Sequence, residues 1–321
     1  MSLPVALTCG EPAGIGPEIA QAAWQVLRAS ETRFFWIGDP AFLGETPWRV
    51  IEAPAEATAV FPDAMPVLLH RFEGPRVPGA PQKAHAQSVI DVIAQAVALT
   101  MAGEAAAVTT APIHKKALID GAGFAYPGHT EYLAALANVA DVVMMLASDQ
   151  LRVVPATIHI ALSEVPAALT PKHLETVLRI TEAGLIRDFG IPRPCIAVAG
   201  LNPHAGEDGA MGHEDASVIA PVLDRLRAEG MALTGPLSAD TLFHAAARVH
   251  YDAAVAMYHD QALIPIKTLD FDRGVNVTLG LPFIRTSPDH GTAFDIAGTG
   301  GANPTSLIEA LRLAHRMAQN R

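Results

Sequence analysis

The fold is decided by two neighbouring stretches, Ala256-Met-Tyr-His-Asp-Gln-Ala-Leu-Ile-Pro-Ile-Lys267 and Gly274-Val-Asn-Val-Thr-Leu-Gly-Leu-Pro-Phe-Ile-Arg285. In both, apolar strand-like pieces alternate with dense polar clusters. A strand in a protein core does not need such polar chemistry at its ends. In open α/β sheets, ligands bind outside the carboxyl ends of the strands, where these polar residues would lie. We therefore interpret this region as half of an active site in an α/β protein.

The composition favours a two-lobed α/β protein. The chain has 321 residues, which is long for one hydrophobic core, so two α/β lobes with a cleft between them are expected. Half of the residues are hydrophobic and the mean hydropathy is +0.26. These values are typical of strands that helices cover on both faces.

Charge and hydropathy argue against several classes of partner. The net charge of −11 argues against nucleic acid or an anionic membrane as the main partner. The longest apolar runs, such as Val142 to Ala147, are too short to span a bilayer, and no signal peptide is recognisable. The two cysteines, Cys9 and Cys195, lie in apolar strand-like runs and are expected to be buried thiols in a reducing compartment. A cytoplasmic protein without nucleic-acid or membrane partners is the expectation.

Strands and helices are expected to alternate along the chain. The predicted strands are Pro4–Cys9, Arg33–Gly38, Val67–His70, Ala105–Thr109, Asp141–Ala147, Arg152–His159, Cys195–Leu201 and Tyr251–Tyr258. Helices are predicted to begin near Glu18 and at Gly128, and to span Gln82–Met101, Thr170–Phe189, Glu214–Ala228 and Thr305–Ala318. The proline-rich region from Pro47 to Pro81 is expected to form surface loops around one strand, and Gly235–Asp240 is expected to be a loop.

Three histidines share one context. His159, His204 and His259 each follow an apolar or β-branched strand and precede a polar or loop segment. Neutral imidazoles that converge from separate strands could hold a divalent metal and leave positions open for a substrate. A histidine at a strand end is, taken alone, more often a hydrogen-bonded structural residue. The context shared by all three makes a metal site about as probable as that structural alternative.

A second polar group could bind anions. Lys267, Asn276 and Arg285 together offer a point charge, a neutral donor and a bidentate fork, which suits a phosphate or a carboxylate. The alternative is a salt-bridged surface, although the sequence around Arg285 is too apolar for an exposed face. Asp240 and Asp260 are candidates to orient a ligand amine or to move a proton, and each is also a plausible cap or turn residue. Asp240, Asp260 and Lys267 are the candidate catalytic residues.

The C-terminal glycine-rich region resembles a known cofactor site. His290-Gly-Thr-Ala-Phe-Asp-Ile-Ala-Gly298, which continues to Asn303, is similar to the adenosine-binding loop of the isocitrate and isopropylmalate dehydrogenase superfamily. The resemblance implies NAD rather than NADP, because a carboxylate at the position of Asp295 accepts from ribose hydroxyls and repels a 2′-phosphate. The implied cofactor-binding residues are His290, Gly291, Thr292, Ala293, Asp295, Ile296 and Asn303.

Further motifs narrow the resemblance to one family. The stretches that begin at Gly10, Gly128, Gly200, Gly235, Met257 and Gly274 resemble, in order, motifs of the 4-hydroxythreonine-4-phosphate dehydrogenases of vitamin B6 biosynthesis. The resemblance implies NAD-dependent and divalent-metal-dependent oxidation of 4-phosphohydroxy-L-threonine to a β-keto acid that decarboxylates to 3-amino-2-oxopropyl phosphate. It also implies a homodimer whose active site is shared between subunits.

Residue by residue, the resemblance also implies a set of metal ligands and a set of substrate contacts. His159, His204 and His259 match the metal ligands, with zinc, cobalt or magnesium as the candidate ions. The matches to substrate contacts are His129, Thr130, Lys267, Asn276 and Arg285. The glycine turn that begins at Gly14 resembles the opening turn of the wider superfamily, although on pattern alone an ordinary strand-to-helix turn is as good an interpretation.

We further expect a division of the chain into two lobes, and several alternative functions stay open. Residues 1–125 with 274–321 are expected to form the cofactor-side lobe, and residues 126–273 the lobe that carries the metal and dimer contacts. The nearest rival is a sister dehydrogenase that acts on 4-phospho-threonate or 4-phospho-erythronate, or on a cyclic dihydrodiol. An acyl or phosphoryl transferase and a ligand-binding protein without turnover are the rivals from other classes.

Overall fold

The computed structural model describes residues 3–321 and divides the chain into two compact units. The first contains the chain up to Ala140 together with Leu281–Gln319, and the second contains Asp141–Gly280. Each unit is a sheet with helices on both faces, so the predicted α/β/α fold class is confirmed. The second unit was expected at residues 126–273. The boundary lies later, so the helix after Gly128 belongs to the first unit, where the Tyr132 hydroxyl donates to the Ile90 carbonyl at 3.4 Å.

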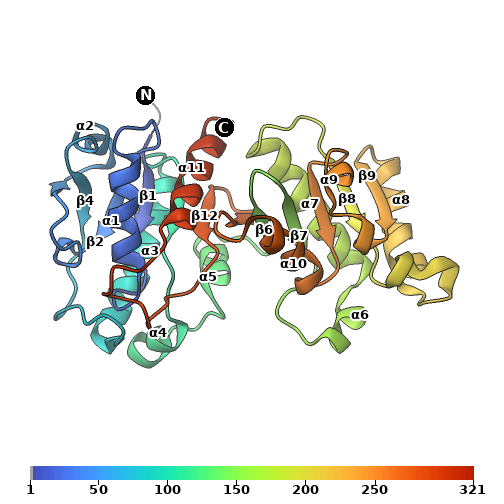
Figure 1. The fold of residues 1–321 in the computed structure, drawn as a ribbon, viewed down its shortest axis with the longest axis horizontal. Coiled ribbons are helices and arrows are strands. Elements are labelled where there is room, and N and C mark those ends of the chain that lie inside the picture. The colour runs from blue at the N-terminus through green and yellow to red at the C-terminus, as the bar shows by residue number, and fades with distance from the viewer. Residues whose placement is uncertain (1–2) are drawn as a thin grey trace. The chain divides into compact units, whose positions relative to one another are not determined.

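The sheet of the first unit is parallel throughout. Its strands, in spatial order, are β3 (Trp48–Ile51), β4 (Met65–Leu69), β2 (Phe34–Gly38), β1 (Val5–Thr8), β5 (Val108–Thr110) and β12 (Arg285–Pro288). Every pair of neighbours in this series runs in the same direction (Figure 1). The carboxyl ends of β1, β5 and β12 therefore meet at one edge of the sheet, where ligands bind in this class of fold.

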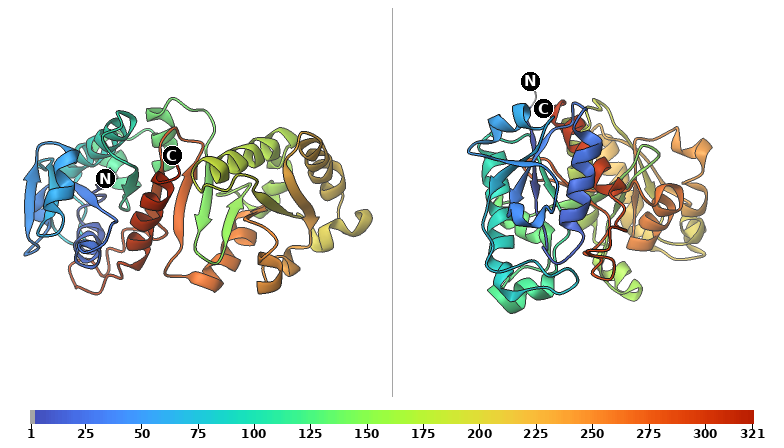
Figure 2. Two further views of the ribbon diagram at one scale, coloured as in Figure 1. Left: turned by 90° about the horizontal axis from the view of Figure 1, so that it is seen from above. Right: turned by 60° about the vertical axis from the view of Figure 1, so that its left-hand side comes forward.

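Helices cover both faces of this sheet. Helices α1 (Gly16–Leu27) and α11 (Thr305–Ala318) pack together on one face, and α3 (Ala86–Met101) lies on the other (Figure 2). The remaining helices are α2 (Ala57–Val60), α4 (Lys115–Ala122) and α5 (His129–Leu136). Trp24, Phe34, Phe35, Trp36 and Phe61 are fully buried, and the Trp24 indole N–H donates to the Phe61 carbonyl at 2.9 Å. Burial of these large aromatic side chains contributes to the hydrophobic stabilisation of the unit.

The second unit has a mixed sheet. Its strands, in spatial order, are β11 (Val275–Leu279), β6 (Val143–Ala147), β7 (Arg152–Pro155), β10 (Ala253–Ala256), β8 (Cys195–Ala199) and β9 (Ala232–Leu237). β6 runs antiparallel to both of its neighbours, whereas β7, β10, β8 and β9 are parallel to one another. The segments that follow β7, β10 and β8 therefore leave the sheet at the same edge.

The helices of the second unit flank this sheet. Helices α7 (Pro171–Arg187) and α8 (Ala220–Ala228) lie on one face, and α10 (His259–Asp270) lies on the other (Figure 2). Short helices α6 (Val165–Ala168) and α9 (Ala245–Arg248) complete the unit. Its core contains Leu146, Val153, Ala254, Leu263 and Ile266, all with at most 7% exposure. Within residues 3–321, none of the helices combines the length and the hydrophobicity that a bilayer crossing requires.

Three local predictions were wrong. The region from Pro47 contains β3 as well as β4, and β9 runs through the segment 235–237 that was expected to be a loop. Both missed strands are sheet edges, where proline is tolerated and the apolar pattern is weak. The apolar piece after His259 is helical rather than strand-like. Ala262, Leu263 and Ile266 face the core at helical spacing, while Ile264 between them is 61% exposed.

Candidate active site

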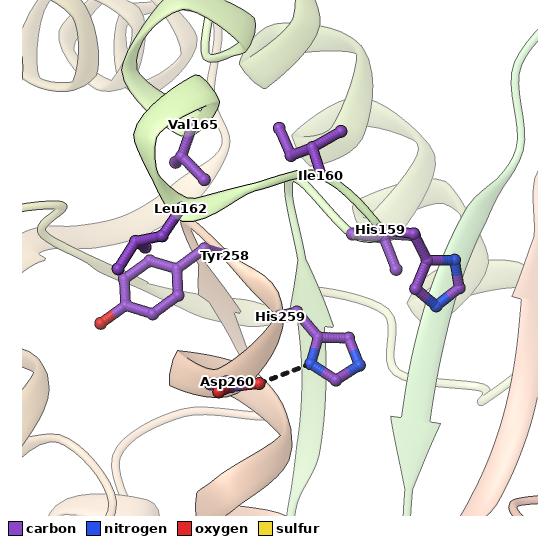
Figure 3. Close-up of a pocket in the computed structure, with 8 residues that line it drawn as sticks. His159, Ile160, Leu162, Val165, Tyr258, His259 and Asp260 are labelled. Carbon is purple, nitrogen blue, oxygen red and sulfur yellow. Dashed lines mark hydrogen bonds and ion pairs between the residues drawn. The ribbon is translucent and has the colours of Figure 1, made fainter.

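Two of the three candidate metal histidines face each other in the second unit. His159 lies beyond the end of β7, and His259 is the first residue of α10, just beyond the end of the adjacent β10. Their ring centroids are 5.8 Å apart (Figure 3). The Asp260 carboxylate lies 2.7 Å from His259 Nδ1, which fixes the orientation of this ring and directs Nε2 to another partner. Two imidazoles at this separation fit binding to a single divalent ion.

Two cavities, each of about 330 Å³, lie beside this pair: both histidines line the first, and His259 alone of the two lines the second. The first is lined by Ile158, His159, Ile160, Leu162, Val165, Tyr258, His259 and Asp260, several of which Figure 3 shows. The second extends along α10 from His259 and Asp260 to Lys267, whose ammonium lies 5.5 Å from the centroid of the Phe271 ring. His259 and Lys267 thus line the same cavity from one helix.

His204 is not part of this pair. It lies in the turn Pro203–Gly209, in which His204 and the four residues after it all have positive φ, from 40° to 82°. The buried Asp215 carboxylate anchors the start of this turn by accepting from the backbone N–H groups of Leu201 and Asn202. Within residues 3–321, no three His, Cys, Asp or Glu side chains gather closely enough to hold a metal ion. Of the three expected metal ligands, His159 and His259 thus lie together, and His204 lies in a separate turn with left-handed backbone.

The other polar candidates of the second unit differ in their surroundings. The Asp240 carboxylate is exposed and accepts from the Ser238 hydroxyl at 2.8 Å. Such a local contact is what we expect if Asp240 is a cap or turn residue. Asn276 is half-buried in β11, where its side-chain oxygen is shielded from solvent and has no hydrogen-bond partner. A buried amide without a partner is costly in the free protein and is well placed to receive a ligand.

In the first unit, Arg285 and His129 form a buried basic group. Arg285, at the start of β12, is 4% exposed, and its Nη2 donates to the Thr110 hydroxyl at 2.7 Å. Burial lowers the pKa of this guanidinium to about 10. His129 and Thr130 open α5, and His129 Nε2 is buried without a hydrogen-bond partner. An anionic group beside these side chains would offset the desolvation of Arg285.

His129 is held neutral, and this gives a testable effect on stability. Burial, and secondly the charge of Arg285, hold the pKa of His129 well below its usual 6.5. The unfolded chain therefore binds more protons than the folded chain as the pH falls through about 6.5, so His129 costs stability at low pH by at most about 1.4 kcal/mol per pH unit. The variant His129→Gln should lose less stability than the unmodified protein between about pH 7 and pH 5.

Urea unfolding at each pH measures this difference. Burial also lowers the pKa values of His85 and His315, but their effects are present in both proteins and cancel in the comparison. His250→Gln, at an exposed position, is the matched control and should follow the unmodified protein. A difference between the His129 variant and the unmodified protein that does not change with pH would contradict the neutral assignment.

The candidate cofactor loop follows β12. Thr292 accepts a backbone hydrogen bond from Ile15 at 3.0 Å, and His290 Nε2 is buried without a partner. Asp295 is exposed, which leaves its carboxylate accessible to a ligand. The Asn303 side-chain oxygen accepts from the backbone N–H and the hydroxyl of Thr305. Asn303 thus contributes to the start of α11 in the free protein, in addition to its predicted role.

Two further polar residues at these strand ends were given no role by sequence reasoning. Thr110, the last residue of β5, orients Arg285 through its hydroxyl. The His114 ring packs edge-on against Phe294 of the candidate cofactor loop, with centroids 5.0 Å apart, and its Nδ1 is buried without a partner. Their position at the carboxyl end of a parallel strand is the signal that could have identified both.

The fold, the site geometry and the comparisons with known proteins together indicate which class of protein this is. A solved structure of 4-hydroxythreonine-4-phosphate dehydrogenase from Klebsiella pneumoniae superposes with a TM-score of 0.89 at 41% identity, over 99% of each chain. A terephthalate 1,2-cis-dihydrodiol dehydrogenase from Burkholderia xenovorans LB400 superposes with a TM-score of 0.69 at 30% identity, over 98% of each chain. The class is an α/β oxidoreductase.

The family follows from the sequence comparisons. Residues 26–314 match the family described as "Pyridoxal phosphate biosynthetic protein PdxA". The protein named 4-hydroxythreonine-4-phosphate dehydrogenase in Ruegeria sp. (strain TM1040) is 65% identical over 318 residues, which cover 99% of this chain and 97% of that protein. The chain belongs to the PdxA family. The family predicted from the sequence motifs is thereby confirmed.

Proposed function

We propose that the chain oxidises 4-phosphohydroxy-L-threonine with NAD, as a step of pyridoxal 5′-phosphate (vitamin B6) biosynthesis. The observation that carries this proposal is the full-length similarity to relatives that are named for this substrate. Oxidation breaks the C–H and O–H bonds at C3, transfers a hydride to NAD and releases a proton. The resulting β-keto acid then loses carbon dioxide and gives 3-amino-2-oxopropyl phosphate.

Arg285 and His129 are proposed to bind an anionic group of the substrate. Arg285 presents a guanidinium fork in a desolvated setting, where hydrogen bonds to phosphate or carboxylate are strong. His129, which is neutral, can donate one hydrogen bond without adding charge. Thr130, the next residue of α5, adds a hydroxyl at the same helix start, where backbone N–H groups also favour anions.

Lys267 and Asn276 are the proposed substrate contacts of the second unit. The Lys267 ammonium supplies positive charge in the cavity along α10, and Asn276 supplies an amide whose oxygen is buried without a partner. A bound substrate amine or hydroxyl would satisfy that oxygen. Asp240 and Asp260 remain proposed to orient the amine or to move a proton. Of these two, Asp260 has the closer connection to the site through its contact with His259.

His159, His204 and His259 are proposed to hold one divalent ion. Such an ion would lower the pKa of the substrate hydroxyl and offset the negative charge that develops as carbon dioxide leaves. The donor chemistry fits zinc or cobalt, and magnesium also fits if substrate oxygens complete the site. His159 and His259 already face each other, and their role in the chain is to present two imidazole rings beyond the ends of neighbouring strands.

The loop 290–303 is proposed to bind NAD, which would accept the hydride. Its exposed Asp295 carboxylate can accept from the ribose hydroxyls of the adenosine. The same carboxylate would repel the 2′-phosphate of NADP. His290, Gly291, Thr292, Ala293, Ile296 and Asn303 are the other proposed contacts. We further propose that the enzyme works in the cytoplasm as a homodimer with residues of both subunits at each active site.

Product analysis tests the proposed chemistry. With 4-phosphohydroxy-L-threonine, NAD and a divalent metal, we expect one carbon dioxide and one aminoketone phosphate for each NADH formed. Mass spectrometry of the phosphorylated product distinguishes this outcome from the alternatives. Release of free phosphate, or transfer of the phosphoryl group without NADH, would contradict the proposal and would favour a transferase. Oxidation of a cyclic dihydrodiol in preference to the phosphorylated substrate would favour a sister dehydrogenase.

A further inference from the structure

A partly buried ion pair lies beside the candidate cofactor loop, outside every contact assigned above. The Arg76 guanidinium lies 2.7 Å from the Glu18 carboxylate, and the two side chains are 15% and 18% exposed. Arg76 also donates to the backbone carbonyls of Pro12, at 2.6 Å, and Gly14, at 3.1 Å. Arg76 therefore joins the segment 71–82 to the glycine turn that opens α1.

The same pair reaches the cofactor loop. The Glu18 oxygen that accepts from Arg76 also accepts from the backbone N–H of Gly298, at 2.6 Å. Gly298 lies against Pro78 so closely that a Cβ at this position would be 2.8 Å from the proline Cβ. Gly79 in turn donates to the Ala13 carbonyl at 2.8 Å. Three segments that are distant in sequence thus meet at one partly buried ion pair.

The cofactor loop depends on such external contacts. Residues 289–304 form no helix or strand, and two of the turns within the loop rest on bonds of 3.2 Å between near neighbours, from Ile296 to Ala293 and from Thr299 to Ile296. Segments held by few long-range bonds open easily. A charge-assisted bond from the loop backbone to a buried carboxylate is stronger than these turn bonds.

We propose that Arg76 and Glu18 are a positioning pair that holds the loop 289–303 in the conformation that binds the anionic dinucleotide. This inference rests on the proposed function of the loop. The pair has two effects. Glu18 fixes the loop backbone at Gly298, and Arg76 neutralises Glu18, whose carboxylate would otherwise repel the phosphates of NAD. Neither side chain takes part in the chemistry.

Hydrogen exchange of the protein without NAD tests the positioning role directly. In Arg76→Met, peptides that cover residues 289–303 and 10–18 should exchange at least about tenfold faster, because the loop loses its buried anchor. Peptides of the second unit, such as those that cover β8, should exchange at the unchanged rate. Arg71→Met is the matched control. Arg71 lies in the same segment, is 71% exposed and pairs with Asp39 at 3.4 Å, so its loss should leave the loop unchanged.

Binding and kinetics give the second readout. Arg76→Met should raise the Kd and the KM for NAD about 10- to 100-fold, while kcat and the KM for the phosphorylated substrate stay within about twofold. Arg76→Lys keeps the charge without the fork and should restore part of the NAD affinity. Glu18→Gln keeps an acceptor for Gly298 without the charge, so it should give a smaller increase in loop exchange. It also tests the pair independently if Arg76→Met does not fold.

The outcomes separate the two proposals. Unchanged exchange of residues 289–303 in both Arg76→Met and Glu18→Gln would overturn the positioning role. Equal losses in NAD affinity and in substrate affinity would also overturn it, because they would indicate general damage. Failure of the unmodified protein to bind NAD would count against the proposed function, while the exchange experiment would still decide whether the pair holds the loop.

Discussion

Arg285→Met is expected to lower kcat/KM for 4-phosphohydroxy-L-threonine about 1000-fold, a loss of about 4 kcal/mol of transition-state stabilisation. Arg285 is 4% exposed, so an anionic substrate group beside it makes its hydrogen bonds in a desolvated setting. Methionine fills similar space but leaves that anion without its charged donor. Arg285→Lys restores the charge without the fork, and should recover only part of the activity.

The same substitution should not destabilise the fold. The pKa of Arg285 is lowered to about 10. This indicates that desolvation destabilises the charged guanidinium by more than its contacts in the free protein stabilise it. Replacing a buried charge of this kind with an apolar side chain is often neutral or stabilising. We therefore expect the Tm of Arg285→Met to be equal to or higher than that of the unmodified protein, alongside the loss of activity.

Steady-state kinetics and thermal unfolding measure both effects. Arg49→Met, at an exposed position on the edge strand β3, is the matched control and should change neither. A large loss of Tm in Arg285→Met would indicate that the arginine is structural. A change in kcat/KM of less than about tenfold would contradict its role as the anion contact.

His259→Ala is expected to abolish metal-dependent turnover, with kcat reduced at least about 1000-fold. His259 and His159 are the two imidazoles that the structure brings together, so removal of either leaves only one histidine of this pair. The variant Asp260→Asn removes the carboxylate beside His259 Nδ1 and leaves the ring in place. It should weaken metal binding by about 10- to 100-fold.

Titration with Zn²⁺ or Co²⁺, followed by calorimetry, measures the metal affinity independently of activity. His250→Ala is the control, because His250 is exposed and remote in sequence from the three candidate ligands. If His259→Ala bound the metal as tightly as the unmodified protein does, the assignment of the histidine pair to the metal site would be wrong. His204→Ala should also lower the affinity if the turn Pro203–Gly209 delivers its histidine to the ion.

Residue chemistry at strand ends predicted where several of the candidate site residues lie in the fold. The parallel strands β7, β10 and β8 end at one edge, so the sequence pattern of a histidine after each strand pointed to a common location. The apolar context of Arg285 correctly predicted its burial. The helix after Gly128 and the two-unit organisation also follow from local signals and chain length.

Other features depend on contacts that sequence reasoning could not supply. The turn that carries His204 is left-handed over several residues other than glycine, against local preference, and is held by Asp215 from further along the chain. The bond between Glu18 and Gly298 joins positions separated by 280 residues. The two edge strands β3 and β9 carry weak apolar patterns, because only one side of each is paired.

Formation of NADH tests the central claim most directly. The metal-loaded protein would be mixed with NAD and 4-phosphohydroxy-L-threonine, with 4-phospho-threonate and a chelator in parallel reactions. We predict rapid NADH formation with the amino substrate, little with 4-phospho-threonate, and none after chelation. NADH formation only with 4-phospho-threonate would move the substrate to the sister enzymes, and absence of NADH with either substrate would contradict the proposed dehydrogenase activity.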